Sequence, residues 1–280
     1  MTRVEWTIVA LVLVGWIPGL ISLSEVWSAV EYASHGYLVP FVALWAATAH
    51  RETLAQLPAA PVPGGRLALG VLALAYVAGL GFGDETLLGL LFVATVAVAV
   101  LALRGVQWLR TLQFPVAYLL FMVPLPNSWV TPLIVELQLF VSTVAVRLLQ
   151  AVDVAIFREG NVLTLPGDRT LFVAEACSGI TSLVTLIPIG VFIAYFTDSV
   201  PWRRAVLVAT VVPIALAGNL LRVILTVMLA IEVDVEFATE GPLHEWAGVG
   251  TYVIGCICLL AVGETLRRLS GERRADAAPS

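Results

Sequence analysis

The chain has 280 residues, of which 60% are hydrophobic and 12% are charged, and its formal net charge is −5 at pH 7. A soluble domain carries about 25% charged residues, so this composition excludes an ordinary soluble domain and indicates an integral membrane protein. All fifteen basic residues are arginine. Chemistry that needs a lysine side chain, such as a Ser–Lys dyad, a Schiff base or a phosphate-binding P-loop, is therefore excluded as well.

Most of the chain consists of apolar segments long enough for transmembrane helices, since a bilayer is crossed by about 20 apolar residues. The strongest candidates are residues 6–23, 66–82, 86–103, 177–197, 205–231 and 245–266. Residues 37–49 and 111–126 are weaker candidates, because the first segment is short and prolines interrupt the second. Together these segments predict about eight spans.

Charged residues at the ends of the segments indicate their orientation. Arginines mark one set of ends, at Arg51, Arg66, Arg104, Arg110, Arg203, Arg204, Arg267, Arg268, Arg273 and Arg274. Acidic residues mark the other set, at Glu25, Glu31, Asp84, Glu85, Glu232, Asp234, Glu236 and Glu240. Because cytoplasmic loops are enriched in arginine and lysine, this bias predicts that both termini are cytoplasmic and that residues 152–174 and 232–243 lie outside.

This topology requires that residues 127–150 do not cross the membrane. Asn127, Thr131, Gln138 and Ser142 share one side of a helical wheel, and aliphatic side chains cluster on the opposite side. The segment is therefore predicted to be an amphipathic helix that lies at the membrane interface or is re-entrant.

A small external β-hairpin is predicted after this helix. Residues 161–165 and 170–174 are strand-like runs on either side of the turn residues Pro166-Gly167-Asp168-Arg169. The predicted fold is therefore an all-α polytopic membrane protein with about eight transmembrane helices, an interfacial amphipathic helix and a small external β-hairpin. We expect residues 1–266 to form one transmembrane domain and the polar residues 267–280 to form a disordered cytoplasmic tail.

Polar groups occur at or near the ends of three very apolar segments. They are Cys177 in Glu175-Ala176-Cys177-Ser178-Gly179-Ile180, Arg222 in Asn219-Leu220-Leu221-Arg222, and His244. The predicted topology places Cys177 and His244 at the outer ends of their spans and Arg222 about 13 Å from the outer end of its helix. Residues far apart in the sequence thus reach similar levels of the outer leaflet. Because such groups are costly beside lipid, their presence indicates a function.

These three side chains can supply a nucleophile, a charge stabiliser and a base. A thiolate at a helix N-terminus is stabilised by the helix dipole and by nearby cations, which makes it nucleophilic at neutral pH. A histidine within reach of a thiol can move its proton. Structural roles are the alternatives: Cys177 as an inert buried cysteine, Arg222 as an arginine paired with an acidic loop, and His244 as an interfacial histidine.

The same motifs resemble the exosortase/archaeosortase family. The runs Ser34-His35-Gly36-Tyr37-Leu38-Val39-Pro40 and Met122-Val123-Pro124-Leu125-Pro126 also match it, so that the resemblance covers about residues 34–264. It implies a membrane cysteine endopeptidase or transpeptidase with Cys177 as nucleophile and with Arg222 and His244 completing a catalytic triad.

The resemblance also implies the substrates and the location. The substrates are exported proteins with a C-terminal sorting signal: a short motif of the Pro-Glu-Pro type (PEP-CTERM), an apolar helix and a basic cluster. Processing would be linked to anchoring at the surface or in exopolysaccharide, with an amine of a lipid or polysaccharide as a possible acceptor. The protein is expected in the plasma (inner) membrane, with its active site facing the periplasm or exterior and no nucleic acid partner.

Supporting or substrate-binding roles are expected for Asn219, Ser178, Glu175 and His35, and neither a metal nor an organic cofactor is implied. His35 falls between the first two predicted spans, on the side of the membrane that carries the other candidate residues; its alternative is a loop histidine that caps the next helix.

Other functions are weaker matches. Ala176-Cys177-Ser178-Gly179 differs by one residue from the Gly-x-Ser-Gly pattern of rhomboid proteases, which would make Ser178 the nucleophile and His244 its base. Gly81-Phe82-Gly83-Asp84 matches an intramembrane aspartyl protease motif, but a second intramembrane aspartate is missing. His244-Glu245 begins like a zincin motif, but the second histidine is absent. A transporter or a scaffold in surface-polymer export is the remaining alternative, although no inverted repeat is evident.

Overall fold

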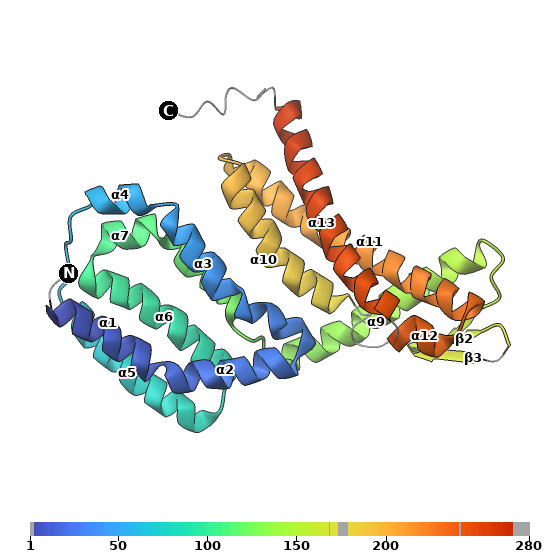
Figure 1. The fold of residues 1–280 in the computed structure, drawn as a ribbon, viewed down its shortest axis with the longest axis horizontal. Coiled ribbons are helices and arrows are strands. Elements are labelled where there is room, and N and C mark those ends of the chain that lie inside the picture. The colour runs from blue at the N-terminus through green and yellow to red at the C-terminus, as the bar shows by residue number, and fades with distance from the viewer. Residues whose placement is uncertain (1–2, 168, 173–178, 241, 271–280) are drawn as a thin grey trace. The chain divides into compact units, whose positions relative to one another are not determined.

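The computed structural model describes residues 3–167, 169–172, 179–240 and 242–270. The chain forms two compact units, Met1–Pro126 and Asn127–Ser280 (Figure 1). Both consist mainly of helices, as the composition predicts. The division falls at the start of the helix that was predicted to be interfacial.

Among the described residues of the first unit, 3–126, all regular elements are helices. They are α1 (Arg3–Gly15), α2 (Ile17–Ala29), the 3₁₀ helix η1 (Glu31–Tyr37), α3 (Val39–Thr48), α4 (Arg51–Gln56), α5 (Gly65–Phe82), α6 (Glu85–Leu103), α7 (Val106–Thr111), α8 (Gln113–Tyr118) and the 3₁₀ helix η2 (Leu119–Met122). The axes of α1 and α2 differ by 40°. At this bend the Trp16 ring packs on that of Tyr76 with a centroid distance of 4.1 Å, and the backbone N–H of Gly19 donates to the Tyr76 hydroxyl.

Helices α5 and α6 are joined by a tight turn. Gly83 has a φ of +63°, and the carboxylate of Asp84 caps α6 by accepting a hydrogen bond from the backbone N–H of Leu87 at 2.9 Å. Asp84 is exposed. Its role as a helix N-cap accounts for this residue without the aspartyl protease chemistry that the Gly-x-Gly-Asp pattern suggested.

The second unit contains α9 (Asn127–Gln150), the strands β1 (Phe157–Glu159), β2 (Val162–Leu165) and β3 (Arg169–Phe172), and then α10 (Ile180–Thr197), α11 (Pro201–Glu232), α12 (Val235–Glu240) and α13 (Pro242–Leu269). Helices α10, α11 and α13 pack side by side, and α9 packs on α11. Glycines allow this close packing: a Cβ at Gly190 of α10 would clash with Val211 of α11, and one at Gly218 of α11 would lie 2.9 Å from Thr251 of α13.

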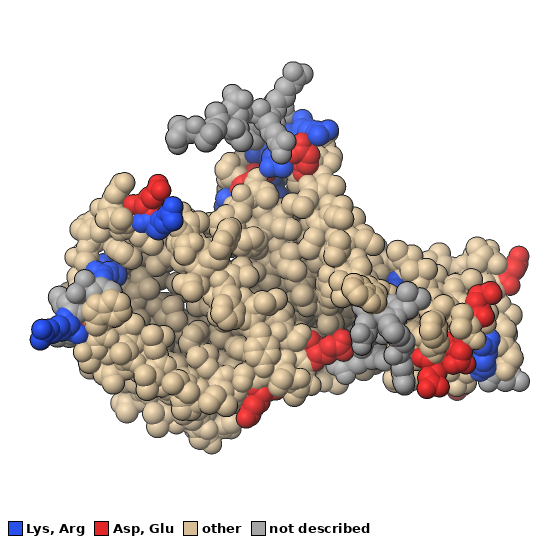
Figure 2. Space-filling model, in the orientation of Figure 1, with Lys and Arg blue, Asp and Glu red and all other residues tan. Residues whose placement is uncertain are grey.

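By length and composition, six of the described helices can cross a membrane, or seven if the bent pair α1–α2 is one span. The prediction of about eight spans is therefore approximate. Residues 37–49 form only the ten-residue α3, and residues 111–126 are broken into short helices. In contrast, α9 is long and apolar enough to cross, so length and composition do not single it out as an interfacial helix. On the face drawn in Figure 2 most of the surface is uncharged, as expected of a protein in lipid.

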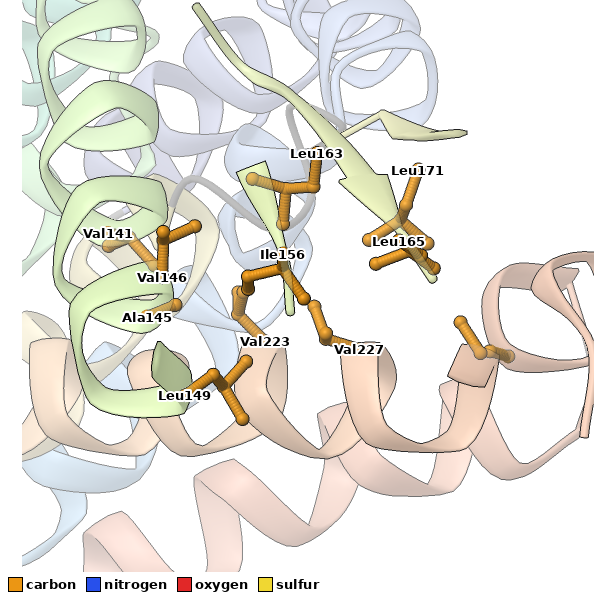
Figure 3. Packing of buried hydrophobic residues seen from close by; sticks show 12 residues of the cluster. Val141, Ala145, Val146, Leu149, Ile156, Leu163, Leu165, Leu171, Val223 and Val227 are labelled. Atoms are coloured by element: carbon orange, nitrogen blue, oxygen red, sulfur yellow. The ribbon is translucent and has the colours of Figure 1, made fainter. Parts of the chain in front are cut away.

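The predicted hairpin is confirmed, and β1 adds a third antiparallel strand before it. One face of β2 and β3 is apolar because residues alternate along a strand, and Leu163, Leu165 and Leu171 are all buried. These leucines form a hydrophobic core with side chains of α9 and α11 (Figure 3). The hairpin is thus packed on α11 rather than held only by its own turn.

The turn between α10 and α11 is held by arginines. Arg203 Nε lies 3.0 Å from Asp198 Oδ2, and both side chains are almost fully buried. Arg204 donates to the backbone carbonyls of Asp198 and Tyr195. Arg267, in the last turn of α13, donates to the carbonyl of Thr197 at 2.9 Å.

Candidate functional site

Helix α11 carries Asn219 and Arg222. The two residues are three positions apart on a helix, so their side chains lie on the same face. Asn219 is completely buried and Arg222 is partly buried. Arg222 lies ten residues before Glu232, where α11 ends, which corresponds to about 15 Å along the helix axis. Arg222 thus lies well inside a long apolar helix, whose end falls one residue beyond the end predicted from the sequence.

Gly179 is the N-cap residue of α10 and packs directly on Asn219. Its φ is +87°, in the left-handed region that glycine adopts without strain. A Cβ built on Gly179 would lie 3.0 Å from Asn219 Nδ2, closer than an ordinary contact. Glycine is therefore required at this position for two reasons: its backbone conformation and the close approach of α11.

Arg222 faces Gly248 of α13. A Cβ at Gly248 would lie 3.6 Å from Arg222 Nη2 and 3.7 Å from Cζ, so the guanidinium occupies the space that a larger residue would fill. His244 belongs to the first turns of the same helix, one turn before Gly248. The side chain of His244 lies outside the described part of the structure.

The second unit thus brings together the three segments that carry the sequence motifs. The start of α10 meets Asn219, and Arg222, one turn further along α11, meets α13 at Gly248. Glu175, Cys177 and Ser178 fall in residues 173–178, outside the described residues, and directly precede Gly179. The meeting of these segments is a property of the fold, whereas the chemical roles of the residues stay predictions.

An apolar groove of about 540 Å³ continues along α11 from Arg222. Its lining residues come from α11, α12 and the start of α13, and are Leu225, Thr226, Met228, Leu229, Glu232, Ala238, Trp246 and Ala247. Leu225 and Thr226 are three and four residues beyond Arg222, so they share its face of the helix. Among the lining residues that the structure describes, the exposed Glu232 is the one that carries a charge. The groove can hold an apolar chain, and its first lining residue on α11 is three positions beyond Arg222.

His35 lies in the first unit, in η1, and contacts backbone carbonyls there. Its Nδ1 is 3.0 Å from the carbonyl oxygen of Tyr32, and its Nε2 is 2.9 Å from that of Phe121. Burial lowers the pKa of His35 below its usual 6.5, although both carbonyls favour the charged form. Burial is the larger effect, because a partly buried ring loses some of the hydration of its charge.

His35 is one of several side chains that donate hydrogen bonds to backbone carbonyls of residues 119–126. Residues 119–126 contain a short 3₁₀ helix and prolines, so several carbonyls there have no helical partner. Side chains elsewhere in the first unit supply donors: Trp27 Nε1 donates to the Met122 carbonyl at 3.0 Å, and the Thr86 hydroxyl donates to that of Pro124 at 2.8 Å. His35, Trp27 and Thr86 therefore hold this run together. The sequence did not indicate this role for Trp27 or Thr86.

Sequence reasoning also missed Arg169, which was assigned only to a turn. Its Nη1 donates to the carbonyl of Ala230 at 2.9 Å and its Nη2 to that of Ile231 at 3.0 Å. The available signal was an arginine beside a tight turn, which does not indicate a distant partner. As for metals, no group of three or more His, Cys, Asp or Glu within the described residues could hold an ion.

The family model described as transmembrane exosortase matches residues 27–261, which is most of the chain. Comparisons with curated proteins and with solved structures gave no match. The matched range includes both the α10–α11–α13 junction and the contacts of His35 in the first unit, and the resemblance inferred from the motifs is confirmed. The chain therefore belongs to the transmembrane exosortase family.

Proposed function

We propose that this exosortase is a membrane-embedded cysteine endopeptidase and transpeptidase that cleaves the C-terminal sorting signals of exported proteins. The observation that carries the proposal is the pair of contacts Gly179–Asn219 and Arg222–Gly248. Through them, the residue after Ala176-Cys177-Ser178, the Asn-x-x-Arg motif and the helix of His244 come to one place. Family membership supports the reaction class.

Chain connectivity supports Cys177 as the nucleophile. A single residue, Ser178, separates it from Gly179, which packs on Asn219, and two positions of a chain span at most about 7 Å. A thiol just before a helix N-terminus and near a guanidinium has the two features that stabilise a thiolate. Arg222 is one helical turn beyond Asn219 and contributes the positive charge.

In the proposed reaction, His244 takes the proton of the Cys177 thiol, and the sulfur forms a bond to the scissile carbonyl carbon. Arg222 stabilises the negative charge that develops on the carbonyl oxygen. The C–N bond then breaks, and His244 donates the proton to the leaving amine. This leaves a thioester, which an acceptor amine or water attacks; the acceptor's proton passes through His244 back to the sulfur.

The apolar groove beside Arg222 supports binding of the apolar helix of the sorting signal. Its walls are almost entirely aliphatic and aromatic, and Trp246 and Leu225 expose large apolar surfaces. Asn219 supports the start of α10, and Ser178 and Glu175 are assigned to substrate contacts. The enzyme acts in the plasma membrane with this site toward the periplasm or exterior, where a lipid or polysaccharide amine is the acceptor.

Co-expression with a reporter protein tests the proposal. The reporter carries a C-terminal tail with a Pro-Glu-Pro motif, an apolar helix and an arginine cluster, and its shortening is followed by immunoblot and mass spectrometry. We expect the wild-type chain to shorten the reporter and Cys177→Ala to leave it intact at equal membrane levels. Normal processing by Cys177→Ala, with loss in Ser178→Ala, would favour the rhomboid-like alternative instead.

A further inference from the structure

A second apolar groove, of about 250 Å³, lies in the first unit between α1 and α5. Helix α1 is joined to its neighbours at either end of this α1–α5 groove: Glu5 Oε2 lies 3.6 Å from Arg104 Nη2, just after α6, and Trp16 packs on Tyr76 of α5. Between these points the groove is lined by aliphatic side chains and glycines of the two helices: Ile8, Leu11, Gly15, Leu69, Gly70 and Ala73. It therefore extends about 12 Å along α1, from Ile8 to Trp16.

The hydroxyl groups that line the α1–α5 groove are already hydrogen-bonded. The Tyr76 hydroxyl accepts from the backbone N–H of Gly19 at 3.0 Å, and the Thr95 hydroxyl donates to the carbonyl of Leu91 at 2.7 Å. Because a polar group buried without a partner is costly, the groove favours an apolar occupant. An α-helix with its side chains is about 10–12 Å across, so the size of the groove suits a hydrocarbon chain better than a helix.

Gly15 and Gly70 keep the groove open. A Cβ on either glycine would meet nothing within 4 Å, so neither is needed for close packing against the described protein. Gly65 of the same helix α5 differs, because a Cβ there would clash with the backbone of Ala102. A glycine inside a helix is destabilising relative to alanine. The local effect of Gly70 is therefore to leave space in the groove, which a ligand can fill.

Arginines lie at the end of the groove that Ile8 and Leu69 line. Arg66 is exposed and precedes Leu69 by three positions on α5, so the two side chains share a face of the helix. Arg104 reaches this end through its contact with Glu5, which precedes Ile8 by three positions on α1. A guanidinium has five N–H donors and matches a phosphate group, so Arg104 can contact Glu5 and a phosphate together. The excess positive charge at this end is complementary to an anionic headgroup.

We propose that the α1–α5 groove binds one acyl chain of an anionic phospholipid, whose phosphate lies against Arg66 and Arg104. The apolar walls hold the chain, and the two guanidinium groups select the headgroup. Basic pockets between transmembrane helices bind anionic headgroups in this way, most often on the cytoplasmic side, which these arginines are predicted to face. The site lies entirely within the first unit, so lipid binding does not depend on the proposed peptidase activity.

Native mass spectrometry of the full-length, detergent-solubilised protein tests the proposal. The probes are phosphatidylglycerol and phosphatidylcholine with identical acyl chains, added in equal amounts. We expect the wild type to retain phosphatidylglycerol about tenfold more than phosphatidylcholine, and Arg66→Ala to lower this preference about fivefold, the effect of one arginine beside an anionic lipid. Gly70→Leu fills the groove and should lower the retention of both lipids about tenfold, because methylene groups of the chain lose their burial.

Two variants serve as matched controls. Gly81→Leu adds the same side chain to α5 at a glycine whose Cβ position also has nothing within 4 Å but which does not line the groove. Arg147→Ala removes an exposed arginine from α9, in the second unit. Both should retain the two lipids as the wild type does. If Gly70→Leu does not accumulate in membranes, Gly15→Leu fills the groove from the opposite wall and takes its place.

Equal retention of the two lipids by the wild type would overturn the proposal, because it would mean that lipid covers α1 and α5 without recognition of its headgroup. Retention of phosphatidylglycerol by Gly70→Leu at the wild-type level would overturn it as well, since the chain would then lie elsewhere. A wild-type dimer that Gly70→Leu converts into a monomer, with lipid retention unchanged, would assign the groove to a second copy of this chain instead.

Discussion

The backbone of Gly179 lies against the amide of Asn219, so that a Cβ at Gly179 would approach Asn219 Nδ2 to 3.0 Å. This contact joins the helix that follows the cysteine motif to the helix of the Asn-x-x-Arg motif. It leaves no room for a side chain, and it requires a left-handed backbone. The junction of the motifs therefore depends on a residue with no side chain chemistry of its own.

Gly179→Ala should impair processing of the reporter by at least about tenfold. An L-residue in the left-handed region costs about 1–2 kcal/mol, and the new methyl group must displace Asn219. Gly167→Ala is the matched control, since Gly167 has a φ of +82° but nothing within 4 Å of its Cβ position. Both variants share the backbone strain, so equal activities would show that the contact with Asn219 is unimportant.

Gly248→Leu should displace the Arg222 guanidinium and reduce turnover, because a Cβ at Gly248 would already be in van der Waals contact with Arg222 Nη2 at 3.6 Å and the rest of the leucine side chain needs further space. Gly250→Leu serves as the control in the same helix, since nothing lies within 4 Å of its Cβ position. Reporter cleavage by the two variants, at equal membrane levels, is the measurement. Full turnover by Gly248→Leu would mean that Arg222 does not need its observed position.

Arg222→Lys should lose about 100- to 1,000-fold in kcat, as expected when a donor to the developing oxyanion is removed. Lysine retains a positive charge but lacks the planar fork of donors. Arg147→Lys, at an exposed arginine of α9 in the same unit, should leave kcat unchanged. Wild-type turnover by Arg222→Lys would reduce the role of Arg222 to charge alone.

Arg203→Ala should destabilise the protein by about 3–5 kcal/mol, because it leaves the buried Asp198 carboxylate without its ion pair. Arg268→Ala breaks an ion pair with Glu264 in which Arg268 is largely exposed, and should cost about 1 kcal/mol or less. Unfolding of the detergent-solubilised variants by denaturant, followed by tryptophan fluorescence, compares the two. Similar losses in the free energy of unfolding of Arg203→Ala and Arg268→Ala would show that Asp198 is hydrated despite its burial.

Acidification should destabilise the first unit through His35. Burial lowers the pKa of His35 in the folded protein below the 6.5 expected on unfolding. Above about pH 6.5 both states are neutral and stability is complete; as the pH falls from 6.5 through the lowered pKa, the unfolded chain binds the proton first and stability is lost.

The measurement for His35 is the Tm of the solubilised protein between pH 7.5 and 5.5, compared with that of His35→Gln. The variant should show a smaller fall in Tm on acidification. A Tm of the wild type that rises on acidification would instead mean that the carbonyls of Tyr32 and Phe121 outweigh burial, because protonated His35 can donate to both.

Hydropathy predicts the uninterrupted helices well. The predicted spans 66–82 and 86–103 differ from α5 and α6 by a single residue at their starts. It fails at residues 111–126, because mean hydropathy does not report whether hydrogen bonding is continuous, and Pro115, Pro124 and Pro126 each lack a backbone N–H. Helix α9 has polar residues on one side, and two of them, Gln138 and Ser142, are buried against protein.

The candidate site was predictable only in its residue types. The cost of burying charge in lipid singles out Arg222, and charge bias along the chain indicates the level at which it lies. Its neighbour Gly248 could not be predicted, because the packing register of α11 on α13 depends on tertiary contacts. The partners of Arg169 could not be predicted for the same reason. The carbonyls at a helix end can accept hydrogen bonds from any nearby donor, and tertiary contacts decide which donor is near.

The arginines around the α10–α11 turn bear on the absence of lysine from the chain. Arg203, Arg204 and Arg267 each donate to a carbonyl or carboxylate of this turn through nitrogens of a planar group. The same residues lie at span ends where positive charge is expected to bias how the spans insert. A lysine has the same positive charge at these positions but lacks the planar group of nitrogens that makes these hydrogen bonds. Insertion depends on the positive charge of these side chains, whereas folding also depends on their planar hydrogen-bond donors. Arginine supplies both properties. Experiments that move such charges to invert the protein will therefore also loosen its structure.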